Sequence, residues 1–458
     1  MQIESTAPRV FPAEEVRGLA AHPPGLSTLF FAEMWERFSY YGMRAILVLF
    51  MVAPVTEGGL GFVTKDAASL YGTYTMLVYM ACVVGGIIAD RLLGASRAVF
   101  VGGVIIAAGH FSMAVHSMSS FYAGLGLIVL GTGFLKPNIS TMVGSLYAPN
   151  DPRRDSGFSL FYVGINIGSL LAPLVCGWLA ESGEFKSFLQ ARGFDPAHSW
   201  HWGFAAAGVG MLVGLAVFSM KRKQLPYAGP KTRAEGKTRH AEPLTANEWK
   251  RILGIAILFA FTIMFWSAYE QKGASLNLFA KQLVDTTLFG WKYPASWLQS
   301  LTPFFVIVLA PIFAKLWIRL GDRQPTGSQK FAIGLFSIGL AMLLLVPASL
   351  LTGQGKISPL WLVGVYFLDV VGEVCLSPVG LSMVTKLAPA KVVGLMMGLW
   401  FFATSLGNKL AGYFSGFFTV NDPATLVRLY GGIAVMLIIG AVVLKFVAPK
   451  IDKMAAAK

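Results

Sequence analysis

The chain has 458 residues, of which 55% are hydrophobic and only 13% are charged, and its mean hydropathy is +0.62. Soluble domains carry about a quarter charged residues, so this composition excludes a soluble globular protein and a disordered chain. The net charge of +14 fits either nucleic-acid binding or the basic cytoplasmic loops of a membrane protein, and the positions of the basic residues decide between them. The three cysteines, Cys82, Cys176 and Cys375, lie in apolar runs and are interpreted as buried packing residues.

Twelve mostly apolar segments are long enough to cross a bilayer, whose core requires roughly 20 residues per helix. Several exceed 25 residues, which predicts tilted or kinked helices. We expect membrane helices at residues 26–53, 66–90, 96–116, 120–147, 154–181, 201–220, 252–283, 294–320, 329–351, 358–388, 391–419 and 424–447.

The basic residues lie mostly on one side of these segments. If residues 1–25 are cytoplasmic, 24 Lys and Arg residues fall on the cytoplasmic side and seven on the opposite side. The positive-inside rule therefore predicts a multi-pass protein of the inner (plasma) membrane with both termini in the cytoplasm. The first 25 residues lack the apolar region and cleavage site of a signal peptide, so we expect the first helix to be the first membrane signal.

The longest polar stretch, residues 221–251, divides the twelve segments into two groups of six. Its basic residues are interpreted as a topology signal rather than a nucleic-acid patch. The expected organisation is a cytoplasmic tail at 1–25, a six-helix bundle at 26–220, a cytoplasmic linker at 221–251, a second six-helix bundle at 252–447 and a cytoplasmic tail at 448–458.

Each half carries an Asp-Arg pair at a cytoplasmic turn, Asp90-Arg91 after the second helix and Asp322-Arg323 after the eighth. Such a pair caps helix ends, and the neighbouring glycines permit close backbone approach. Two six-helix halves with this turn resemble the major facilitator superfamily. The expected fold is therefore an all-α membrane protein with twelve transmembrane helices in two six-helix bundles and no extra helix pair between them, in which Asp90 and Arg91 act in gating.

Charges inside the membrane are the main functional signal, because each costs roughly 2.5–3.5 kcal/mol at mid-helix unless it is paired or hydrated. The first helix places two acids, two bases and a tyrosine within about a 100° arc, with a second tyrosine beside it. This polar stripe consists of Glu33, Glu36, Arg37, Tyr40, Tyr41 and Arg44.

Other helices add further polar groups, and the two halves differ in sign. The first half contributes mostly bases and the second mostly acids, which suits a zwitterionic ligand with a carboxylate at one end and an ammonium at the other. The bases are Arg37, Arg44 and Lys136, and the acids are Glu270, Asp369 and Glu373.

The motif Glu-x-x-Glu-Arg-Phe-x-Tyr-Tyr-Gly at 33–42 resembles the hallmark of the proton-dependent oligopeptide transporter family. The segments 85–94 and 161–170 and the pattern Phe-Trp-x-x-x-Glu-Gln at 265–271 are similar to further signatures of that family. The similarity extends from about residue 26 to residue 447.

This resemblance implies proton-coupled uptake of di- and tripeptides across a lipid bilayer by alternating access. It implies no cofactor besides the coupling proton, and we expect a functional monomer. Salt bridges Arg44–Glu270 and Lys136–Glu373 are expected to close the outer side. The implied proton-coupling residues are Glu33, Glu36, Arg37, Lys136 and Glu270. The implied peptide-binding residues are Arg37, Tyr40, Tyr41, Arg44, Tyr79, Lys136, Tyr162, Asn166, Trp266, Glu373, Trp400, Thr404 and Ser405.

Three features depart from the family pattern. The 221–251 stretch is too short and too polar for the extra helix pair of many bacterial members. Thr302 stands before Pro303 where the family commonly has Asn, and the second helix has no histidine. His110 and His116 lie on the third predicted helix, and we assign them a structural role.

Three alternatives stay open at this point. One is a major facilitator carrier of another substrate, such as nitrate or an organic anion, or a drug exporter; Glu373 disfavours a simple anion because it repels one. The second is a membrane enzyme, but the sequence has no His-Glu-x-x-His, Gly-x-Ser-x-Gly or clustered Cys/His pattern, so we expect no catalytic or metal site. The third is a receptor or scaffold without turnover.

Overall fold

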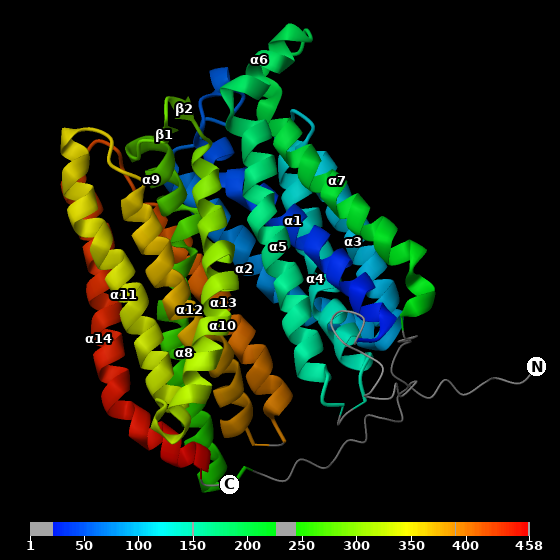
Figure 1. Cartoon of the computed structure of the whole chain (residues 1–458), viewed down its shortest axis with the longest axis vertical. Helices are drawn as coiled ribbons and strands as arrows, with labels where there is room; N and C mark the ends of the chain where they lie inside the picture. Colours follow the sequence, from blue (N-terminus) through cyan, green and yellow to red (C-terminus); the bar gives the residue numbers. More distant parts are fainter. Residues whose placement is uncertain (1–21, 149–150, 226–243, 390, 457–458) are drawn as a thin grey trace, which may run out of the picture. The chain divides into compact units, whose positions relative to one another are not determined.

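A computed structural model of the chain describes residues 22–148, 151–225, 244–389 and 391–456. Regular structure in these residues is nearly all helical, and each of the twelve predicted segments forms a helix of at least 19 residues. These helices are α1 (Pro24–Val52), α2 (Thr64–Ile88), α3 (Ala95–Met113), α4 (Met118–Ser145), α5 (Arg154–Glu181), α7 (Ser199–Met220), α8 (Ala246–Tyr269), α10 (Leu301–Leu320), α11 (Gly327–Leu351), α12 (Leu360–Leu387), α13 (Val393–Ser415) and α14 (Pro423–Ala456) (Figure 1).

Two short helices and a hairpin supplement the long helices. The short helices are α6 (Gly183–Ala191) and α9 (Ser275–Leu283). The hairpin pairs β1 (Thr287–Leu288) with β2 (Trp291–Lys292) in antiparallel register, and it was not predicted from the sequence.

Ten helical spans in the described ranges are long and apolar enough to cross a membrane. The long helices α1 and α13 are outside this set. In α1, four charged residues between Glu33 and Arg44 reduce the apolar character that a span needs. One of the two long helices outside this set is therefore the helix that carries the predicted functional stripe.

The described residues group into two compact units. Unit 1 comprises the described residues of Met1–Met43, Ala81–Cys176 and His201–Gly236. Unit 2 comprises Arg44–Met80, Gly177–Trp200 and the described residues of Lys237–Lys458. The units do not follow the predicted halves, because parts of α1, α2, α5 and α7 belong to each; the division into two six-helix bundles at 26–220 and 252–447 stays a prediction.

Unit 1 is built on α3 and α4, which lie along each other (Figure 1). The first turns of α1 pack into the core of this unit. The core contains Leu26, Leu29, Ala32, Val99, Ile106, Leu135, Ile139, Met211 and Leu215. Helices α2 and α4 approach closely at Gly133, where a Cβ would lie 2.7 Å from the carbonyl oxygen of Ala81.

In unit 2, most of the long helices pack in pairs. Helix α11 lies along α14 and α12, while α13 packs on α8 and α10 packs on α12 (Figure 1). The first part of α2 meets α13 at glycines from both helices: a Cβ on Gly72 would lie 2.8 Å from the Cα of Gly412. Small residues at such crossings allow membrane helices to approach backbone to backbone.

The seventh predicted span differs from expectation because it is not one helix. Helix α8 ends at Tyr269, a 3-10 helix, η7 (Glu270–Gly273), follows, and α9 begins at Ser275. Ala274 between them has φ −125° and ψ −96°, which is outside helical geometry. Discontinuous membrane helices expose polar backbone and side chains at the break, which makes the break a candidate functional position.

The C-terminal end also differs from expectation. Helix α14 continues to Ala456, so most of the segment assigned to a C-terminal tail, 448–458, is helical. Asp452 explains part of this extension, since its carboxylate accepts hydrogen bonds from Thr326 Oγ1 at 2.5 Å and from the Ser328 backbone N at 3.4 Å. These bonds connect the end of α14 to the beginning of α11.

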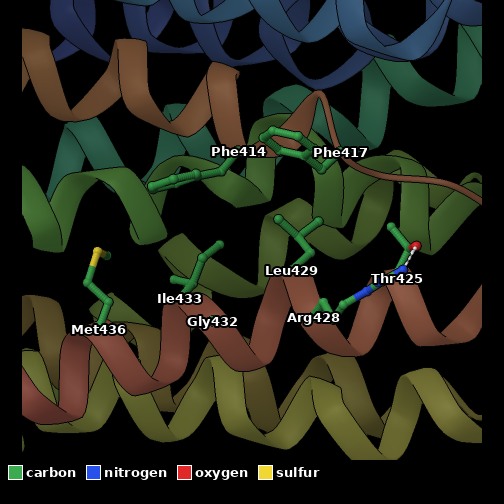
Figure 2. Close-up of a pocket in the computed structure, with 8 residues that line it drawn as sticks. All are labelled: Phe414, Phe417, Thr425, Arg428, Leu429, Gly432, Ile433 and Met436. Atoms are coloured by element: carbon green, nitrogen blue, oxygen red, sulfur yellow. Dashed lines mark hydrogen bonds between the residues drawn. The ribbon is translucent and has the colours of Figure 1, made fainter.

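A groove of about 470 Å³ lies between α13 and α14. Figure 2 shows aromatic and aliphatic side chains along most of its length, with Thr425 and Arg428 at one end. Arg428 is already engaged there, since it donates to Thr425 Oγ1 at 2.8 Å and lies 3.6 Å from Asp422. The charge of Arg428 is therefore already compensated at this end of the groove.

Candidate functional site

The polar stripe of α1 forms a compact ion cluster in unit 1. Arg37 Nε donates to Glu33 Oε1 at 2.8 Å and lies 2.6 Å from Glu36 Oε2. All three side chains are buried, with 4% or less of each exposed. The i, i+4 spacing of Glu33 and Arg37 brings them together within a single helix. Glu33 Oε2 and Arg37 Nη2 make no hydrogen bond to any described residue, so the cluster retains capacity for a further polar partner.

Tyrosines extend this cluster along α1. The Arg37 guanidinium lies 5.8 Å from the centre of the Tyr40 ring, and Tyr40 packs edge to face on Tyr41 at 5.2 Å. Lys136 on α4 is half-buried and belongs to the same unit. Unit 1 thus combines two carboxylates and two cations beside aromatic rings, an arrangement able to hold an anion and a proton.

The two predicted residues on α5, Tyr162 and Asn166, differ from each other in exposure. The side chain of Asn166 is buried, and its amide nitrogen donates to the backbone oxygen of Tyr162 at 2.9 Å. Tyr162 itself is 43% exposed. One amide hydrogen of Asn166 is therefore used within its own helix.

A buried ion pair in unit 2 joins α1 to the break after α8. Arg44 Nη2 pairs with Glu270 Oε2, and Arg44 Nε donates to the hydroxyl of Tyr71 on α2 at 2.5 Å. Arg44 is 6% exposed and Glu270 3%. Gly273 makes this approach possible, because a Cβ there would lie 3.1 Å from Arg44 Nη2 and closer still to the Tyr71 hydroxyl. An ion pair buried in this way is strongly destabilised when one partner is lost.

Gln271 holds the break in place. Its amide nitrogen donates to the backbone oxygens of Ser267 at 2.9 Å and Ala411 at 3.1 Å. Its amide oxygen accepts from the hydroxyls of Ser275 at 2.6 Å and Ser415 at 2.7 Å. The bonds to Ala411 and Ser415 hold η7 against α13, and those to Ser267 and Ser275 connect it to α8 and α9, so together they fix the position of the adjacent Glu270.

Three further charged groups lie near the break. The hydroxyl of Tyr269 donates to Glu373 Oε2 on α12. Lys272 is 6% exposed, and its Nζ lies 3.0 Å from the centre of the Tyr269 ring. Asp369, one helical turn before Glu373, is fully buried, and neither of its carboxylate oxygens has a hydrogen bond to a described residue. Together with Arg44 and Glu270, these residues form a charged cluster that we call the unit 2 cluster.

The two predicted tryptophans of unit 2 have different surroundings. Trp266 is half-buried, and its Nε1 makes no hydrogen bond to any described residue. Trp400 is 5% exposed, and its ring packs on Phe259 at 6.3 Å and on Phe331 at 6.5 Å. Trp266 also packs on aromatic rings, Phe265 at 5.6 Å and Tyr269 at 5.0 Å, and in addition retains a free Nε1 donor.

Two predicted hydroxyls on α13 are used inside that helix. Thr404 Oγ1 donates to the backbone oxygen of Trp400 at 3.1 Å, and Ser405 Oγ donates to that of Phe401 at 2.8 Å. Both side chains are buried. Tyr79, on α2, is half-buried.

The Asp-Arg turns lie at exposed ends of helices. Asp90 and Arg91 occupy a π-helical turn, Ala89–Leu93, which ends at Gly94 with φ +75°. The second turn, a 3-10 helix from Gly321 to Arg323, begins at Gly321 with φ +50°. A positive φ favours glycine at both positions.

The histidines make contacts of a structural kind. His110 is buried, with Nε2 3.1 Å from Ser39 Oγ. His116 Nδ1 lies 2.9 Å from His201 Nε2, and His201 Nδ1 is 3.1 Å from the Met113 oxygen. Within the part of the chain that the structure describes, no three His, Cys, Asp or Glu side chains gather as metal ligands.

Several residues of the unit 2 cluster were missed by sequence reasoning. Tyr71 and Tyr269 bind the charged groups, and Lys272 directly follows the motif at 265–271. The signal for Lys272 was its place beside that motif inside an apolar span. Tyr269 carried a similar signal, since it lies within that motif, whereas Tyr71 carried none, because its partner Arg44 is 27 positions away.

A second set of contacts in unit 2 connects the end of α5 and α6 with α9 and the hairpin. Glu181 accepts from Lys281 Nζ at 2.7 Å and from the Ser296 backbone N at 3.2 Å. Glu184 accepts from Trp291 Nε1 at 2.7 Å. We call this set the α5–α9 latch.

Of the two expected gating pairs, one lies within a single unit and the other has a residue in each unit. Arg44 and Glu270 are in contact within unit 2. Lys136 belongs to unit 1 and Glu373 to unit 2, so this second pair stays a prediction.

Comparison with known proteins places this chain in a family. The model of the POT family matches residues 96–245 and 236–431. The chain is 37% identical to the peptide transporter YePEPT of Yersinia enterocolitica over 93% of this chain and 94% of that protein. It is 34% identical to a di-/tripeptide transporter of Lactococcus lactis subsp. cremoris over 94% of this chain and 96% of the relative.

Solved structures agree with these relatives. A mutant of a peptide transporter POT in complex with alafosfalin superposes with a TM-score of 0.86 at 39% identity, covering 96% of this chain and 97% of that one. A POT family transporter in complex with 5-aminolevulinic acid has a TM-score of 0.83 at 28% identity, covering 95% and 98%. The fold is that of the major facilitator superfamily, as predicted, and the chain belongs to the POT family of transporters.

Proposed function

We propose that this protein takes up di- and tripeptides together with protons by alternating access. The observation that carries the proposal is the buried pair Arg44–Glu270, which connects α1 to the broken helix after α8. The relatives named as peptide transporters support the substrate class. Major facilitator proteins alternate access by rocking movements around a central site, so a pair that holds two elements together is a suitable gate.

Protonation of Glu270 is the proposed trigger. A neutral carboxyl no longer compensates the buried guanidinium of Arg44, so the pair loses most of its attraction. Tyr71 then keeps its hydrogen bond to Arg44 while α1 and η7 separate. A proton thereby favours the conformational change without any covalent step.

The proposed substrate contacts follow the charges. Arg37 and Lys136 bind the peptide carboxylate, and Glu373 binds the amino terminus with help from Asn166. The aromatic groups Tyr40, Tyr41, Tyr79 and Trp266 line the site. A peptide carboxylate also competes for Lys136 with Glu373, which makes substrate a second trigger beside the proton.

The remaining properties are proposed with the same function. The protein works as a monomer in the plasma membrane, with both termini in the cytoplasm, without a cofactor other than the proton and without catalytic turnover. Labelling of single cysteines placed at Asp90 and at Lys186 by a membrane-impermeant maleimide tests the orientation. The Lys186 position is expected to react from outside intact cells and the Asp90 position only after permeabilisation.

Uptake into proteoliposomes tests the function. Under an inward proton gradient, radiolabelled dialanine is expected to accumulate above its external concentration, and a protonophore is expected to abolish the accumulation. A dipeptide library is expected to compete, whereas nitrate and single organic anions are not. Nitrate competition without dipeptide competition would refute the proposal in favour of an anion carrier.

A further inference from the structure

Asp369 is the acid of the unit 2 cluster that the proposed mechanism does not use. It lies within α12, is fully buried, and has no hydrogen bond or ion pair with any residue that the structure describes. An ionised carboxylate in so apolar a place requires an adjacent cation or several donors. A protonated carboxyl is neutral and carries a far smaller desolvation cost.

Two charged groups are placed near Asp369 through Tyr269. Glu373, one helical turn later on the same helix, accepts a hydrogen bond from the Tyr269 hydroxyl, and the ammonium of Lys272 on η7 lies over the Tyr269 ring. The neighbouring phenol is Tyr366, whose hydroxyl makes no hydrogen bond to a described residue. The hydroxyl of Tyr269, on α8, is committed to Glu373.

The unit 2 cluster has one negative charge too many. Its cations are Arg44 and Lys272 and its acids are Glu270, Asp369 and Glu373, so full ionisation leaves a net charge of −1. Four of these side chains are buried, and Glu373 is half-buried. One bound proton makes the cluster neutral. Glu270 is compensated by Arg44, and Glu373 accepts from Tyr269, whereas Asp369 has no such partner.

Lys272 is placed to respond when Asp369 loses a proton. Its Nζ is buried, makes no hydrogen bond to any described residue, and lies over the Tyr269 ring. A long and flexible side chain in a cation–π contact can move to a carboxylate within a short distance. Breakage of the Asp369 O–H bond releases the proton to water and leaves a carboxylate for the Lys272 ammonium.

We propose that Asp369 is a proton-carrying site of this transporter and that Lys272 is its counter-charge. The inference rests on the proposed function and adds a second proton site to Glu270. The unpartnered, fully buried carboxyl and the unpartnered, buried ammonium in the same cluster carry it.

The proton-to-dipeptide ratio tests the inference. Proteoliposomes are clamped at zero membrane potential, and the dialanine gradient that just balances an imposed tenfold proton gradient is measured. Asp369→Asn is expected to move one proton fewer per dialanine, so the balancing dialanine gradient falls about tenfold. Counterflow of dialanine, which needs no net proton movement, is expected to continue. Asp66→Asn, which changes an exposed carboxylate at the beginning of α2, is the matched control with an unchanged ratio.

An unchanged ratio in Asp369→Asn, with active transport, would overturn the inference. Absence of dialanine counterflow in the wild-type protein would instead refute the proposed function, so the two failures are distinguishable.

A second measurement applies if Asp369→Asn does not fold. Infrared difference spectra between acid and alkaline pH are expected to show loss of a protonated carboxyl band, and this band is expected to persist in both Glu270→Gln and Glu373→Gln. Lys272→Gln is expected to shift the pH midpoint of dialanine exchange upward, because the proton is held more tightly without the counter-charge. No carboxyl band together with an unshifted midpoint in Lys272→Gln would overturn the inference.

Discussion

The two buried charge clusters of this protein are assembled in different ways. In unit 1, Glu33, Glu36 and Arg37 lie within four residues of one helix, and one cation serves two acids. In unit 2, Arg44 meets Glu270 across 226 positions of the sequence. The first cluster persists as long as α1 is helical, whereas the second exists only while separate elements are together. A pair of the second kind reports the conformation of the protein, and this difference underlies the proposed gating role of Arg44–Glu270.

The largest expected effect comes from breaking the long-range pair. Arg44→Gln leaves Glu270 buried without its cation, which costs about 3–5 kcal/mol. We expect a marked fall in the thermal unfolding temperature of the protein in detergent. The double variant Arg44→Gln/Glu270→Gln replaces the pair by two amides and is expected to recover much of the loss. A double variant no more stable than Arg44→Gln would contradict a direct pair.

A smaller effect is expected in the cluster of unit 1. Glu33→Gln removes one hydrogen bond to a charged group, worth about 1.5–3 kcal/mol, but Arg37 keeps Glu36 as a partner at 2.6 Å. The fall in unfolding temperature is therefore expected to be clearly smaller than for Arg44→Gln. Equal falls in the two variants, measured in the same detergent, would remove the proposed contrast between the clusters.

In the α5–α9 latch, the two partners of one ion pair, Lys281 and Glu181, differ in burial, so the costs of replacing them can be compared. Lys281 has 42% of its side chain exposed, so Lys281→Gln is expected to cost about 1 kcal/mol or less and to lose its effect at high salt. Glu181 is 1% exposed and also accepts from the Ser296 backbone, so Glu181→Gln is expected to cost more. Thermal unfolding at low and high salt measures both, and an equal cost for the two variants would show that the backbone bond contributes nothing.

The smallest expected effect is pH-dependent and lies outside the membrane-spanning segments. His22 Nδ1 is 2.9 Å from the Tyr147 hydroxyl, and burial, followed by the charge of Arg153, lowers the pKa of His22 below its usual 6.5. Because the pKa of His22 is lower in the folded protein than in the unfolded chain, neutral His22 contributes its full share to the free energy of unfolding above pH 6.5. This contribution is lost as the pH falls through the pKa of His22 in the folded protein. We expect His22→Gln to make the decrease in the free energy of unfolding below pH 6.5 smaller by a few tenths of a kcal/mol. An identical pH dependence of unfolding in wild type and His22→Gln would contradict this assignment.

Much of the fold was predictable because it depends on local patterns. Each of the twelve apolar segments contains a long helix, since run length and hydropathy determine whether a segment can cross a bilayer. The break at Glu270 was not predicted, because the residues from Tyr269 to Ser275 contain no proline and only one glycine. It is stabilised by Gln271 through bonds to α13, and such bonds depend on the tertiary fold.

In the site, too, contacts within one helix were predictable from the sequence, whereas most contacts between distant residues were not. The contacts of Glu33 with Arg37 follow from helical spacing, and the pair Arg44–Glu270 was expected from resemblance to the family. The partners of these groups were not predictable: Tyr71 on Arg44, Tyr269 on Glu373 and the latch of Glu181 with Lys281 each join residues at least 27 positions apart. The hydroxyls of Thr404 and Ser405 looked available in the sequence, yet each is bonded to a backbone oxygen of α13.

The most direct test of the account is transport by Glu270→Gln in proteoliposomes, with Glu57→Gln as a matched exposed control. Proton-driven accumulation and counterflow of dialanine are measured on the same preparation. If protonation of Glu270 releases Arg44, the permanently neutral Gln is expected to abolish accumulation under an inward proton gradient while counterflow continues. Accumulation equal to that of the wild type and of Glu57→Gln would contradict the central role of the Arg44–Glu270 pair.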